Sequence, residues 1–187
     1  MTILPIDEIN ALEDRLKVHF EDEGTGRIKS KKDAQEIIDE LLDLFLLAYA
    51  DGVESVNASM GSNIKQPIET VEETVYKKVA GKTWVDRVWD YYDSGGTVYD
   101  IARIAATESH RDANEAAYVT ATDAGATVKT WHCMMLPTSR DDHVWLDGVT
   151  APMDGYFYAG NGERTLFPGQ WGIPEQDINC LCWLTYS

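Results

Sequence analysis

Apolar residues recur every three or four positions through most of the first 125 residues, and this spacing predicts that this part of the chain is mainly amphipathic helix. The longest such run covers residues 30–60, and Ser30 followed by Asp33 resembles a capping box at its start. The apolar face of this run contains Ile37, Ile38, Leu41, Leu42, Phe45 and Tyr49. Leu44, Leu46 and Leu47 widen that face, so the helix needs neighbours on two sides. Other helices of the same chain are the favoured neighbours, and another subunit is the alternative.

Four further segments show helical spacing, namely residues 7–20, 68–81, 84–92 and 98–125. Gly81 is predicted to end the helix over residues 68–81. Gly81-Lys82-Thr83 also resembles the tail of a phosphate-binding loop, but Tyr76 replaces the other glycine that such a loop requires. We therefore do not expect nucleotide binding at this point.

The pattern changes after Gly125, because four of the six prolines lie in residues 126–187. Short strands are predicted over residues 128–135, 156–158, 165–167 and 180–186. Residues 138–145 favour a short helix capped by Thr138 or Ser139, and Asp147-Gly148 favours a turn. The predicted fold class is α+β, with an N-terminal helical module (residues 1–97) followed by a small C-terminal α+β domain with a short-stranded sheet (residues 98–187).

Charge, hydropathy and cysteine content narrow the partners and the cell compartment expected for this chain. Asp and Glu number 32 against 16 Lys and Arg, a formal net charge of −16, which disfavours specific nucleic-acid binding. The first residues lack a basic stretch followed by an apolar one, so no secretory signal is expected. The longest apolar run, residues 44–50, is far below the roughly 20 residues of a membrane span. Three cysteines cannot all pair within one chain, so reduced thiols and cytosolic synthesis are expected.

Two groups of residues could carry chemistry. In the first, Glu108, Arg111 and Asp112 lie at helical spacing and can pair on one helix face. Such a pair could be catalytic, but a structural ion pair is the favoured interpretation.

The second group combines Arg140-Asp141-Asp142-His143 with Cys180-Leu181-Cys182. On a strand the two sulfurs would face the same side, where they could bind zinc together with His143. A disulfide between them would be strained. Packing as buried thiols is favoured over metal binding, because only three ligands are in view and the Cys-x-Cys spacing is atypical.

Read in order, several short motifs of residues 100–187 resemble the phage head morphogenesis family, the minor head proteins similar to the F protein of phage Mu. The residues that carry this resemblance are Thr107, Glu108, Arg111, Lys129, Trp131, Arg140, His143, Gly148, Pro168, Gly169, Asn179, Cys180 and Cys182. Gln170 stands where the family usually has Asp after Pro-Gly, and Leu181 stands where it has Arg between the cysteines. The family's acidic residue shortly before Arg-x-x-His is also missing here.

The resemblance implies a structural minor head protein of a tailed phage, located inside the head near the portal and acting in head assembly or DNA delivery. It implies portal or capsid partners, synthesis in the bacterial host cytoplasm, no enzymatic activity and no cofactor; self-association is a further expectation.

One alternative is an ADP-ribosyltransferase-like enzyme in which Arg103, Glu108, Arg111 and His143 line a nucleotide cleft. That class also needs a Ser-Thr-Ser-like strand and a Glu-x-Glu element, which this sequence lacks. A host-directed toxin is the other alternative.

Overall fold

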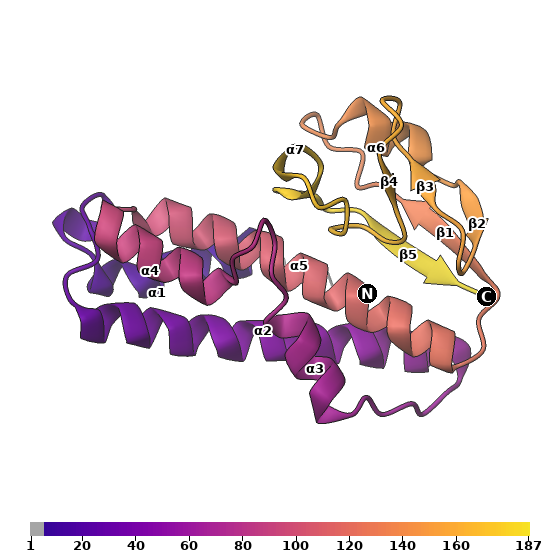
Figure 1. Ribbon diagram of the computed structural model, residues 1–187, viewed down its shortest axis with the longest axis horizontal. Coiled ribbons are helices and arrows are strands. Elements are labelled where there is room, and N and C mark those ends of the chain that lie inside the picture. The colour runs from indigo at the N-terminus through magenta and orange to yellow at the C-terminus, as the bar shows by residue number, and fades with distance from the viewer. Residues whose placement is uncertain (1–5) are drawn as a thin grey trace.

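The computed structural model describes the backbone of residues 6–187 and the side chains from residue 11 onward. Helices occupy the first two thirds of the chain and short antiparallel strands follow, which confirms the predicted α+β class (Figure 1). The α-helices of the first part are α1 (Ile6–Leu16), α2 (Lys31–Met60), α3 (Ile68–Val75), α4 (Trp84–Ser94) and α5 (Val98–Asp123). The later elements are β1 (Val128–His132), α6 (Asp141–Leu146), β2 (Thr150–Pro152), β3 (Phe157–Tyr158), β4 (Arg164–Thr165), α7 (Pro174–Asp177) and β5 (Trp183–Tyr186).

The two long helices α2 and α5 lie side by side and run in the same direction along the long axis (Figure 1). As predicted, α2 is one continuous helix, and at its start the Ser30 Oγ accepts a hydrogen bond from the Asp33 backbone N–H at 3.2 Å. The helix ends at Gly61, whose φ of 65° suits glycine. Gly52 allows the close approach of the helices, since a Cβ there would lie 2.2 Å from the Ala113 carbonyl oxygen.

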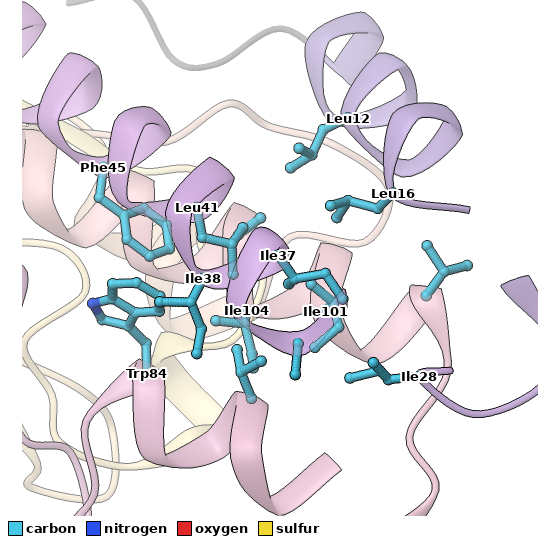
Figure 2. Packing of buried hydrophobic residues seen from close by; sticks show 14 of the residues in the cluster. Leu12, Leu16, Ile28, Ile37, Ile38, Leu41, Phe45, Trp84, Ile101 and Ile104 are labelled. Atoms are coloured by element: carbon cyan, nitrogen blue, oxygen red, sulfur yellow. The ribbon is translucent and has the colours of Figure 1, made fainter. Parts of the chain in front are cut away.

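The larger hydrophobic core lies between α1, α2, α4 and α5 (Figure 2). Phe45 is fully buried and meets the Trp84 ring edge to face, with ring centroids 5.0 Å apart. Leu41 and Tyr49 are also buried, which confirms that the apolar face of α2 packs within its own chain. Leu46 and Leu47, which widen that face in the sequence, remain 40% and 66% exposed.

Two helix ends differ from the prediction. The predicted helix over residues 7–20 stops as an α-helix at Leu16, and a 3₁₀ turn over Lys17–His19 leads to Phe20, which bridges to Ile28. The predicted helix over residues 68–81 was wrong in its second part, because α3 ends at Val75. Val79 and Lys82 instead form a tight turn in which Ala80 and Gly81 have φ of 51° and 82°. Gly81 therefore makes a turn between helices.

The small sheet has the order β2-β1-β5, with β1 antiparallel to both neighbours, and β3 and β4 form a separate hairpin. The sheet lies over the C-terminal half of α5 (Figure 1). Strand β1 ends at His132, earlier than the predicted Met135. Strand β5 begins only at Trp183, so Cys180 and Cys182 precede it. The sequence did not predict β2 or α7.

Helix α6 begins later than predicted, at Asp141, with Arg140 as its N-cap. The predicted cap at Thr138 or Ser139 was wrong, because the Ser139 Oγ accepts from the Leu136 N–H and closes a turn of its own.

Helix α5 contributes to both parts of the molecule. Ile101 and Ile104 belong to the helical core, whereas Ala117 and Ala121 lie in a small cluster with Met153 beside the sheet. The domain boundary expected between residues 97 and 98 falls at the N-cap of this shared helix. Within residues 6–187, no helix combines the length and the apolar character needed to cross a bilayer.

Candidate functional site

His143, Cys180 and Cys182 meet inside the C-terminal part of the chain. His143 projects from α6, and the two cysteines lie between α7 and β5. The His143 Nδ1 is 3.6 Å from the Cys180 Sγ and 3.5 Å from the Cys182 Sγ, and all three residues are buried. The sequence grouped these residues correctly. It placed the cysteines on a strand, whereas they precede β5 and their side chains still turn to the same interior.

The other imidazole nitrogen is held by Gln176 from α7, which sequence reasoning missed. The His143 Nε2 lies 2.9 Å from the Gln176 Oε1. The Gln176 amide nitrogen in turn donates to the carboxylates of Asp142 and Glu163, at 3.3 Å and 3.2 Å. Because both carboxylates accept hydrogen bonds, the amide presents its oxygen to the imidazole and the His143 Nε2 donates the proton. This chain of contacts fixes the His143 ring.

Aromatic rings pack against the His143 side chain. Trp171 stacks on the His143 ring with centroids 5.7 Å apart and planes 13° apart. Trp131 of β1 meets the same ring edge-on at 5.8 Å and is fully buried. The resemblance marked Trp131, whereas Trp171 had no signal in the sequence.

The two thiols have opposite pKa shifts. The pKa of Cys180 lies well below its ordinary value, chiefly because it interacts with the Cys182 side chain, with His110 and His143 adding to the effect. The pKa of Cys182 is raised, first by the same contact and then by burial.

A cavity of about 240 Å³ opens beside the cluster. Its lining includes the three cluster residues together with Cys133, Arg140 and Asn179. Arg140 also donates to the Ile178 carbonyl oxygen at 2.6 Å, which anchors the segment before Cys180 to the start of α6. Asn179 has a φ of 56° in that segment. The cavity gives the sulfurs an open side.

Glu108, Arg111 and Asp112 form the ion-pair network that the sequence predicted on α5. Arg111 contacts Glu108, and its Nη2 lies 2.7 Å from the Asp112 carboxylate and 3.3 Å from the Thr74 carbonyl oxygen on α3. Arg87 of α4 pairs with Glu108 from the other side, a partner without a signal in the sequence. Burial raises the pKa of Asp112 to about 8, because the effect of desolvation is larger than the opposing effect of the Arg111 charge. The network joins three helices.

The remaining residues of the resemblance occupy framework positions. Pro168 and Gly169 are buried. Gly169 has a φ of 85°, and a Cβ there would lie 3.1 Å from the Arg111 Cα, so this position favours glycine. Gly148 turns the chain with a φ of 77° and donates to the Trp131 carbonyl oxygen at 2.8 Å. Thr107 is half-buried on α5.

Lys129 is fully buried in β1. Its Nζ donates to the carbonyl oxygens of Met153 and Leu166, each at 2.8 Å, and lies 4.9 Å from the centre of the Tyr118 ring. Burial lowers the pKa of Lys129 to about 8. The ammonium group therefore ties β1 to the two loops that flank the hairpin of β3 and β4.

The four residues of the hypothetical nucleotide cleft do not line one cavity. The Arg103 Nη2 donates hydrogen bonds to the Tyr91 hydroxyl at 3.0 Å and to the Asp100 carboxylate at 3.3 Å, on the side of α4. Glu108 and Arg111 are enclosed in the buried network, and His143 alone lines the cavity beside the cysteines. This arrangement does not support the enzyme alternative.

Comparison with family models, curated proteins and solved structures finds no match to this chain. The chemistry of the site follows from its own groups. Two sulfurs and one imidazole nitrogen lie within 4.8 Å of one another, a donor set suited to soft or borderline divalent metals. The residues His143, Cys180 and Cys182 are therefore the candidate metal ligands of the C-terminal part.

Proposed function

We propose that this chain is a structural minor head protein of a tailed phage, placed inside the head near the portal and acting in head assembly or DNA delivery. The ordered motifs over residues 100–187 are the ground for the phage assignment. The observation that supports a structural role is the placement of Glu108, Arg111, Lys129 and Trp131, which are all buried and paired or packed within the chain. Side chains used in this way are not free to act on a substrate.

The surface charge is compatible with this role. A protein with a net charge of −16 is repelled by packaged DNA, so contact with the head is expected through portal or capsid proteins. Exposed Leu46 and Leu47 on α2 lie on the helical arm that would meet such partners.

Purified particles of the phage that encodes this chain provide the test. Mass spectrometry of washed particles should detect the protein, and particles made without its gene should show defective assembly or DNA delivery. Complementation with the intact gene should restore infectious particles. A protein that is absent from the particles and dispensable for their formation would refute the proposal.

Two simpler measurements address the alternatives. Calorimetry of the purified protein with NAD should give no heat of binding, whereas micromolar affinity would support the transferase alternative. Expression of the chain alone in a bacterial host should leave growth unchanged. Growth arrest would instead support a toxin and would count against a purely structural role.

A further inference from the structure

We propose that His143, Cys180 and Cys182 bind one zinc ion, and that the fourth zinc ligand is a water on the side of the adjoining cavity. The sequence favoured packed thiols at this place, and the interatomic distances now favour a metal. This inference goes beyond the proposed phage role and does not depend on it.

The spacing of the three ligand atoms fits tetrahedral coordination. Zinc bonds of about 2.3 Å to sulfur and about 2.0–2.1 Å to nitrogen place a sulfur and a nitrogen about 3.6 Å apart at a tetrahedral angle. The observed distances from the His143 Nδ1 to the Cys180 and Cys182 sulfurs are 3.6 Å and 3.5 Å. The side chains therefore need little movement to hold an ion between them.

The hydrogen bonds around His143 leave its ligating nitrogen free. Since the Nε2 donates to the Gln176 Oε1 at 2.9 Å, a neutral imidazole carries its lone pair on Nδ1, facing the two sulfurs. The Cys180 and Cys182 sulfurs approach this Nδ1 at nearly equal distances, 3.6 Å and 3.5 Å. A cation shared by all three atoms accounts for this convergence. A partner on the outer nitrogen is also the usual arrangement for histidines that bind metal.

The fourth position is left to a solvent ligand. Among the described residues, the cluster supplies three protein ligands, His143, Cys180 and Cys182, whose ligand atoms lie within 4.8 Å of one another. No fourth His, Cys, Asp or Glu side chain in the described part of the chain belongs to this group. The cavity of about 240 Å³ next to the sulfurs has room for water. Three protein ligands with one open position form a recognised zinc geometry.

Metal content and cobalt substitution test the proposal. The full chain, purified under reducing conditions and dialysed after incubation with zinc, should retain about one zinc per chain by mass spectrometry of the metal. Cobalt should bind in its place, giving tetrahedral visible bands and thiolate-to-cobalt charge transfer. Less than about a tenth of an equivalent of zinc, together with no such cobalt spectrum, would overturn the proposal.

Variants identify the ligands. Cys180→Ser and Cys182→Ser should each lower the cobalt charge-transfer intensity by about half or abolish binding. Gln176→Leu should weaken zinc binding about tenfold to a hundredfold, because it frees the imidazole ring.

Cys133→Ser is the matched control, because Cys133 is buried and lines the same cavity but lies outside the ligand cluster. This variant should bind zinc like the parent protein. Circular dichroism checks that each variant folds, and the cobalt spectrum of the unaltered chain tests the site even if a variant does not. Loss of binding in Cys133→Ser would contradict the three-ligand assignment.

Discussion

Lys129 shows how one buried charge can hold several loops together. Its ammonium group is surrounded by carbonyl dipoles and aromatic faces, with both hydrogen bonds going to backbone oxygens. Such partners satisfy the three donors of a lysine less completely than a carboxylate would, because they carry only partial charges. The folded protein therefore disfavours the protonated form, in line with the lowered pKa.

The stability of the protein should depend on Lys129 in a pH-dependent way. Its pKa falls from 10.5 to about 8 on folding, so between these values the unfolded chain binds more protons and stability rises with pH. Lys129→Met removes this contribution. Urea unfolding from pH 7 to 10 should show the parent gaining roughly 2–3 kcal/mol relative to the variant. Parallel curves for the two proteins would show that Lys129 does not titrate in this way.

Phe45 allows a test of side-chain packing in the apolar core. It is fully buried against Trp84, and its loss would leave a cavity between α2 and α4. Phe45→Ala should lower the free energy of unfolding by about 3–5 kcal/mol. Leu47→Ala on the exposed side of the same helix serves as the control, with a change of about 0.5 kcal/mol or less in chemical denaturation. Similar losses in both variants would contradict this assignment of the helix face.

The contact between α2 and α5 is the largest between two elements, and it depends on small residues. Gly52 faces the Ala113 carbonyl group and the Ala116 methyl group, which lets two parallel helices approach along their length. An alanine at a helix interior usually increases stability by about 1 kcal/mol over glycine. At this crossing, steric overlap with backbone atoms opposes that gain, since a backbone carbonyl cannot move aside as a side chain can.

Gly52→Ala should therefore destabilise the protein, by about 1–3 kcal/mol, despite the better helix propensity. Thermal unfolding followed by circular dichroism measures the effect. Asp51→Ala, one position earlier on the exposed surface of α2, should be nearly neutral. A more stable Gly52→Ala variant would mean that the helices are further apart than the structure shows.

The acidic surface of the entire chain should make its stability depend on ionic strength. The net charge of −16 on 187 residues means that acidic side chains repel one another, and this repulsion is stronger in the compact state than in the unfolded chain. Raising sodium chloride from low concentration to about 0.3 M should increase Tm by several degrees, because the Debye length falls below about 10 Å. Potassium chloride should act equally, which separates screening from specific ion binding. A Tm that falls with salt would show that attractive surface pairs dominate.

Local signals predicted much of the framework. The apolar period of residues 30–60 and the Ser30 cap predicted α2, because both act within one or two helical turns. The helix over residues 68–81 was overextended, since hydrophobic spacing carries no information about the turn at Ala80 and Gly81. The cap of α6 was misplaced because several polar residues in a row could serve, and Ser139 was already engaged with Leu136.

The amino-acid pattern alone determined the α+β class, the long helix α2 and the grouping of His143 with Cys180 and Cys182. The class and the helix follow from periodicity, which is a property of neighbouring positions, whereas the grouping followed from residue type and from the family resemblance. Only the tertiary structure decided that Arg87 joins Glu108, that Gln176 orients His143 and that Trp171 covers it. Each of these contacts joins separate elements, and their geometry depends on how those elements pack, which no local spacing encodes.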